Sequence, residues 1–147
     1  MFIDNVSLLN KDNNMRGSLQ AYKQVSVNAQ LASASPHRII QMLYAGAIER
    51  LIQGKAAMEQ GNIAVKCERL TKALDIVLSL RDCLSMEDGG DIAKNLDALY
   101  DFMGSEISRA NAENVTQPLD DVMGMLREIK SAWDQIPTEY HYLTETN

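Results

Sequence analysis

The sequence predicts an all-α protein, an antiparallel four-helix bundle. Four segments of roughly 20–26 residues carry apolar residues at spacings of three and four, the pattern of an amphipathic helix. The connections between these segments are short, which favours antiparallel neighbours. The chain of 147 residues contains only 8 Gly and 3 Pro, which disfavours a fold of many short strands. The bundle is expected over residues 35–137, after a flexible N-terminal lead-in and arm (1–34) and before a short C-terminal tail (138–147).

The first two helices have clear ends in the sequence. Ser35 is a favourable N-cap residue and Pro36 suits the first helical position, so the first helix is expected to begin here. Gly61 provides a stop, because glycine readily adopts the left-handed conformation that ends many helices. Asn62 then caps a second helix, which is expected to continue to about Met86.

The last two helices are defined by their apolar stripes. The third is expected from about Gly90 to Glu113. The fourth is expected to begin near Thr116, another N-cap residue, and to end before Pro137. Its apolar residues alternate between spacings of three and four: Leu119, Val122, Leu126, Ile129, Trp133 and Ile136. This single narrow stripe is typical of an outer helix that contacts the bundle on one side.

Composition excludes several classes of protein. The net charge of −6 and the absence of a basic block disfavour binding to nucleic acid or to an anionic membrane. No stretch reaches the roughly 18 consecutive apolar residues of a membrane span, and the N-terminus lacks the apolar core of a signal peptide. The two cysteines, Cys67 and Cys83, would lie about 24 Å apart on one helix, too far for a disulfide. We expect inert, partly buried thiols in a reducing cytoplasm.

No catalytic or metal-binding motif is found. The histidines are His37 and His141, and the residues three positions earlier, Ala34 and Thr138, are not the glutamates that a di-iron bundle requires. His37 follows a proline in the first helical turn and is expected at the surface. We therefore expect neither a metal nor a cofactor.

The acidic residues are expected to have structural rather than catalytic roles. Asp97 and Asp101 share one face of the third helix, which is expected to be solvated. Glu87, Asp88 and Asp91 are favoured near a helix N-terminus and need no bound ion. The chain is therefore not expected to be an enzyme.

The first helix is apolar over a wider arc than a bundle core requires, notably between Ile39 and Ile52. Two interpretations remain open. Either the apolar patch of the N-terminal arm covers the surplus permanently, or the surplus forms a binding groove that the arm shields only when the groove is empty. That patch comprises Leu19, Tyr22, Val25 and Val27.

Four segments carry a family resemblance, in order along most of the chain. They are Gln20–Val27 (QAYKQVSV), Ala34–Ala47 (ASPHRIIQMLYAGA), Gly89–Ser108 (GGDIAKNLDALYDFMGSEIS) and Leu119–Trp133 (LDDVMGMLREIKSAW). In these segments the chain resembles the FliS family of flagellin-specific export chaperones.

The resemblance implies a cytosolic four-helix bundle that binds the disordered C-terminal segment of flagellin in an apolar groove. Such a chaperone prevents premature polymerisation and delivers its client to the flagellar type III export apparatus. The implied partners are flagellin, the export gate protein and, as further candidates, flagellar regulators. Nine residues match family positions in the arm, the first helix and the third helix: Tyr22, Met42, Leu43, Tyr44, Leu96, Leu99, Tyr100, Met103 and Asn111.

Some of these nine residues are expected in the core rather than in the groove. Asn111 has a second interpretation as a helix C-cap. The chain departs from the family at Ala45, where members usually carry Asp. The alternative function is a homodimeric structural or regulatory bundle without flagellin as a client, and a weak homodimer is compatible with either function.

Overall fold

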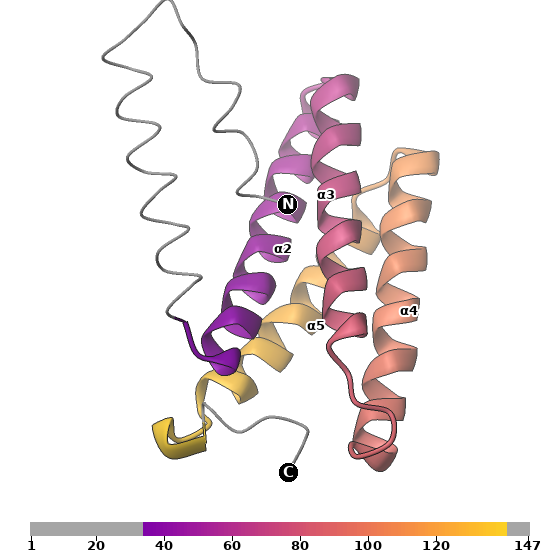
Figure 1. Cartoon of the computed structure of the whole chain (residues 1–147). Helices are drawn as coiled ribbons and strands as arrows, with labels where there is room; N and C mark the ends of the chain where they lie inside the picture. Colours follow the sequence, from indigo (N-terminus) through magenta and orange to yellow (C-terminus); the bar gives the residue numbers. More distant parts are fainter. Residues whose placement is uncertain (1–33, 141–147) are drawn as a thin grey trace, which may run out of the picture. The chain divides into compact units, whose positions relative to one another are not determined.

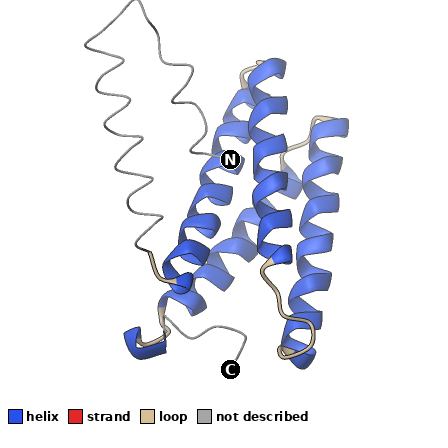
Figure 2. Ribbon diagram, in the orientation of Figure 1, coloured by secondary structure: helices blue, strands red, loops and turns tan. Residues whose placement is uncertain are grey.

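The computed structural model describes residues 34–140, in which four long helices form a bundle (Figures 1 and 2). The helices are α2 (Pro36–Glu59), α3 (Ile63–Asp82), α4 (Gly90–Glu113) and α5 (Gln117–Asp134), and the 3-10 turn η2 (Thr138–Tyr140) follows them. No strand occurs between residues 34 and 140, which confirms the prediction of an all-α helical bundle. Tyr22 lies outside the described residues.

Each helix packs against two others. α2 contacts α3 and α5, and α4 contacts the same two helices. The connections between consecutive helices are short, so consecutive helices run antiparallel (Figure 1). The core lies between all four helices, where Leu51, Leu70, Met103 and Leu126 are each at most 1% exposed.

Local signals set most helix ends. The Asn62 side chain accepts a hydrogen bond from the Val65 amide at 3.2 Å and so caps α3 as expected. Gly61, after α2, has a φ of 73°, a conformation that glycine adopts without strain. α3 ends at Asp82 rather than near Met86, so the predicted second helix was too long.

The stripe of α5 divides into two parts along the helix. Leu119, Val122 and Leu126 are fully buried in the bundle. The later members of the same stripe, Ile129, Trp133 and Ile136, are only half-buried. The bundle therefore closes around the first half of α5 and leaves apolar surface along the second half.

Candidate functional site: an apolar groove at one end of the bundle

A groove of about 1010 Å³ opens at one end of the bundle. Its lining comes from the start of α2, the end of α3, the α3–α4 connection, the start of α4, and the chain from the end of α5 to η2. These segments lie at the lower end of the bundle in Figure 1. The half-buried residues at the end of α5 contribute to this lining, which explains why they are not enclosed by the core.

Two tyrosines from opposite helices lie in the lining, where α2 and α4 face each other. Tyr44 and Tyr100 are 3% and 2% exposed, and their hydroxyl oxygens are 2.6 Å apart. Burial raises the pKa of both phenols above the ordinary value, and for Tyr44 the hydrogen bond with Tyr100 raises the pKa further. Both hydroxyls are therefore neutral, and each satisfies the other within an apolar surrounding.

The rim of the groove is apolar and exposed. Ile39, Ile92 and Tyr140 are 36%, 74% and 52% exposed, and all three line the groove. Half-buried Leu96 and Ile136 extend the same surface inward. Single exposed apolar residues are common on proteins, but several gathered around a concave apolar surface are typical of a site that binds another protein.

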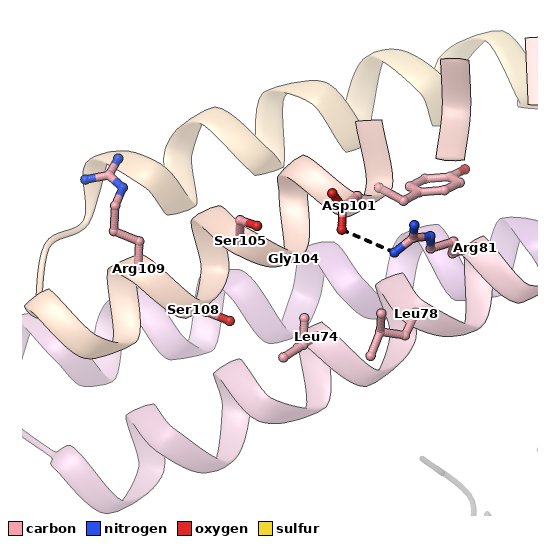
Figure 3. A pocket seen from close by; sticks show the side chains of 9 residues that line it. Leu74, Leu78, Arg81, Asp101, Gly104, Ser105, Ser108 and Arg109 are labelled. Atoms are coloured by element: carbon pink, nitrogen blue, oxygen red, sulfur yellow. Dashed lines mark hydrogen bonds and ion pairs between the residues drawn. The ribbon is translucent and has the colours of Figure 1, made fainter. Parts of the chain in front are cut away.

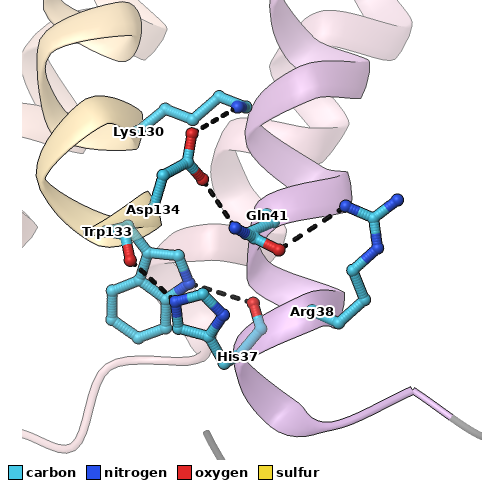
Figure 4. A network of polar contacts seen from close by, with 6 residues as sticks. All are labelled: His37, Arg38, Gln41, Lys130, Trp133 and Asp134. Carbon is cyan, nitrogen blue, oxygen red and sulfur yellow. Dashed lines mark hydrogen bonds and ion pairs between the residues drawn. The ribbon is translucent and has the colours of Figure 1, made fainter. Parts of the chain in front are cut away.

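A pair of aromatic residues ties the two helices that form one wall (Figure 4). The His37 Nε2–H group donates to the Trp133 carbonyl at 2.7 Å, and the Trp133 indole N–H donates to the His37 carbonyl at 2.9 Å. The two rings stack with centroids 5.0 Å apart. His37 is only 4% exposed. The expectation of a surface histidine was therefore wrong, because the indole of Trp133 stacks on its ring and both residues bond across the helices.

Polar contacts extend this connection outward from the aromatic pair. Gln41 Nε2 and Lys130 Nζ each lie 2.7 Å from a different oxygen of the Asp134 carboxylate (Figure 4). These two hydrogen bonds, that from Lys130 first, lower the pKa of Asp134. These contacts hold the start of α2 on the end of α5, so this wall of the groove is formed before any other protein binds.

Three of the residues suggested by the family resemblance line the groove, namely Tyr44, Leu96 and Tyr100. Met103 is 0% exposed in the core. Met42, Leu43 and Leu99 are half-buried and do not line the groove. The function of all these residues in binding stays a prediction.

Asn111 lies at the opposite end of α4 from the groove. Its carbonyl accepts a hydrogen bond from the Lys66 ammonium at 3.1 Å, and the Asn114 side chain accepts another at 3.2 Å. The Cys67 thiol lies 3.6 Å from the Asn111 side-chain oxygen. The C-cap of α4 is Asn114, with a φ of 56°, so the interpretation of Asn111 as the cap was wrong. Asn111 instead helps to hold α4 on α3.

The two cysteines are both exposed, not partly buried as expected. They differ in location, because Cys83 lines the groove and Cys67 lies near the far end of α3. They provide one chemical probe inside the candidate site and one outside it.

A second, smaller pocket of about 550 Å³ lies between α3 and α4 (Figure 3). Leu74, Leu78 and Arg81 form its α3 side, and the α4 side is mostly polar, with Asp101, Ser105 and Ser108 among its residues. Arg81 bonds Asp97 at 2.6 Å and Asp101 at 3.2 Å, and its hydrogen bond lowers the pKa of Asp97. The two aspartates are therefore ion-pair partners between helices rather than a plain solvated face. This pocket offers much less apolar surface than the groove.

Within the described part of the chain, no group of three or more His, Cys, Asp or Glu side chains is arranged to hold a metal ion. In the same residues, no helix combines the length and apolar character needed to cross a membrane.

The sequence reasoning missed several lining residues, chiefly His37, Leu84, Trp133 and Ile136. One signal was available. The apolar stripe of the fourth helix continues for nearly three turns beyond Leu126, longer than the buried core of this bundle requires.

Comparisons with known proteins identify the family. The family model described as "Flagellar protein FliS" matches residues 18–140. The chain is 75% identical over 130 residues to the flagellar secretion chaperone FliS of Vibrio cholerae, covering 88% of this chain and 96% of that relative. It is 44% identical to the flagellar secretion chaperone FliSB of Pseudomonas aeruginosa, over 81% of this chain and 94% of the relative. It is 43% identical to the flagellar secretion chaperone FliS of Salmonella typhimurium, over 80% of this chain and 88% of that relative. The chain belongs to the FliS family of flagellar export chaperones.

Proposed function

We propose that this chain is a cytosolic chaperone that binds the C-terminal segment of flagellin in the groove at the end of the bundle. Binding there prevents premature polymerisation of the client and presents it to the flagellar type III export apparatus. The observation that carries the proposal is the exposed apolar rim around an apolar groove, in a chain whose relatives are named flagellar secretion chaperones.

The groove suits a peptide segment with apolar side chains on one face. Amphipathic helices commonly bind by placing such a face in an apolar groove. A disordered client loses conformational freedom when it binds, so burial of large apolar side chains must offset that loss. The groove offers apolar partners on several sides, among them Ile92, Leu96 and Trp133.

The rest of the chain and the other partners belong to the same proposal. Residues 1–34 act as an arm, residues 35–137 form the bundle, and residues 138–147 act as a tail. Tyr22 of the arm competes with the client for the groove. The loaded chaperone then docks on the export gate protein, and flagellar regulators are further candidate partners. In this proposal Tyr22→Ala strengthens client binding, because the variant arm competes less well for the groove, and weaker binding would contradict this role of Tyr22.

Cysteine footprinting tests the proposed site directly. The chain has two cysteines, so a thiol reagent reports on Cys83 in the groove and on Cys67 outside it. We expect the C-terminal segment of flagellin to slow modification of Cys83 at least severalfold and to leave Cys67 unchanged. Equal protection of both cysteines, or of neither at saturating segment, contradicts the proposed site.

The single tryptophan gives an independent readout. Trp133 lines the groove, so a client segment without tryptophan should change its emission with a 1:1 stoichiometry. Calorimetry on the same samples should show a negative heat-capacity change from apolar burial.

The alternative function predicts a different result. If the apolar rim is buried in a homodimer, light scattering shows a stable dimer that the flagellin segment does not dissociate. In that case raising the protein concentration, without any flagellin segment, slows the modification of Cys83.

A further inference from the structure

The charged residues that line the groove all lie on one of its sides. The lining contains no Lys or Arg, and its two acidic residues are Asp82 and Asp88. Asp82 ends α3, and Asp88 lies in the connection to α4. The walls from α2 and α5 contribute apolar and aromatic residues, such as Ile39 and Trp133. The groove is therefore apolar across most of its surface and negative at the α3–α4 side.

Several carboxylates elsewhere on the bundle are paired with cations. Asp97 bonds Arg81 at 2.6 Å, and Asp120 bonds Lys55 at 2.8 Å. By contrast, the Asp82 carboxylate forms no ion pair within residues 34–140, and Asp88 accepts only a 3.4 Å hydrogen bond from the Ser85 hydroxyl. No cation within residues 34–140 therefore forms an ion pair with either groove carboxylate.

The surrounding sequence reinforces this negative charge. The stretch 82–93 contains no Lys or Arg, and Glu87 and Asp91 add to the two groove aspartates. Two cations flank this stretch in the sequence: Arg81 bonds Asp97 and Asp101 and lines the second pocket, and exposed Lys94 does not line the groove. A charge of one sign beside a low-dielectric apolar surface attracts an opposite charge more strongly than it would in open solvent.

We propose that the groove selects a peptide segment in which a lysine or arginine flanks the apolar anchor residues, and that this cation lies beside Asp82 and Asp88. The inference rests on the proposed function and adds the orientation of the client segment within the groove. The apolar walls supply most of the affinity, and the aspartates fix the orientation and reject segments that are acidic at this point.

The test uses the full chain and the C-terminal segment of flagellin, with Trp133 emission as the readout. The Asp82→Asn/Asp88→Asn variant should bind about three- to tenfold more weakly at low salt, as expected for loss of partly exposed charge pairs. Its binding should also depend less on salt between about 0.05 M and about 0.5 M than that of the unmodified chain, because fewer charges remain to be screened. Replacing the basic residues of the segment by Gln one at a time should identify one position whose loss is not additive with the double variant.

A control variant separates local pairing from net charge. Glu59→Gln removes an exposed carboxylate at the C-terminal end of α2, away from the groove, and should leave the affinity unchanged. If the double variant and Glu59→Gln weaken binding equally, or if the double variant binds normally, the charge proposal is overturned and the groove itself is not. If the segment fails to bind the unmodified chain, both proposals are overturned.

Discussion

The two ends of the bundle use the same four helices in opposite ways. At the end where α2 stops and α3 begins, the core is closed by Leu51, Leu70 and Leu119, all of which are fully buried. At the other end, where α3 stops and α4 begins, exposed Ile39 and Ile92 surround a groove. Apolar residues thus stabilise the fold at one end and remain available to a partner at the other.

Polar contacts follow the same division. At the closed end, the Lys66 ammonium is buried and bonds the last turn of α4 through Asn111 and Asn114, while Lys55 bonds Asp120 between α2 and α5. A cation at a helix C-terminus satisfies carbonyls that lack helical partners. At the open end, polar contacts join neighbouring helices around His37 and Asp134 and between Arg81 and Asp97, and the rim of the groove stays apolar and exposed. Substitutions at the two ends should therefore separate stability from binding.

The largest expected effect is a loss of stability at the closed end. Leu70→Ala removes a side chain that is 1% exposed and should lower the free energy of unfolding by about 2–5 kcal/mol. Urea unfolding followed by circular dichroism measures this loss. Affinity for the flagellin segment, measured where the variant is still folded, should change little. A loss of affinity with unchanged stability would show that the two ends are not separable in this way.

A smaller loss is expected when the buried ammonium is removed. Lys66→Met leaves the Asn111 carbonyl and the Asn114 side chain without their charged donor and should cost about 1.5–3 kcal/mol of stability. Lys94→Met, at an exposed position of α4, is the control and should change stability by less than about 0.5 kcal/mol. Equal unfolding midpoints for the two variants would rule out the proposed role of Lys66 at the end of α4.

The tyrosine pair connects stability to pH at the open end. The pKa of both phenols is raised in the folded chain, so their protonated forms are favoured by folding. Stability from this pair is complete below the ordinary tyrosine pKa of 10.0 and decreases as the pH rises above it. Tyr44→Phe/Tyr100→Phe should weaken this decrease, as measured by urea unfolding between about pH 8 and pH 10.5. If the stability of the double variant falls with pH as steeply as that of the unmodified chain, the loss of stability comes from other groups.

Local sequence signals predicted much of the fold and only part of the site. The starts of α2 and α3 follow from Pro36 and Asn62, because helix ends are encoded by adjacent residues. The end of α3 was missed because apolar Leu84 and Met86 continue the helical pattern, although Leu84 lines the groove and Met86 is exposed.

The groove itself depends on contacts between distant parts of the chain. His37 and Trp133 are 96 residues apart, and no local pattern relates them. Each looked ordinary alone, His37 as a surface residue in a first turn and Trp133 as a member of a helical stripe. Family positions such as Met103 were suggested by resemblance, but burial separates them from positions such as Leu96 that line the groove. Periodicity identifies which residues are apolar on one face, and only packing decides which of them remain uncovered.

The smallest expected effect on stability comes from the rim of the groove, where the effect on binding should be clear. Ile92→Gln replaces a side chain that is 74% exposed and should change the free energy of unfolding by less than about 0.5 kcal/mol. Because a bound client would bury this side chain, affinity for the flagellin segment should fall about fivefold or more.

Ile63→Gln is the matched control for this prediction. Ile63 is 67% exposed in the first turn of α3, much as Ile92 is in the first turn of α4, but it does not line the groove. Its replacement should leave both stability and affinity unchanged. Calorimetric titration of the two variants side by side measures whether exposed apolar surface matters only at the open end. Equal losses of affinity would mean that the client contacts both ends, and that the groove is one part of a longer binding surface.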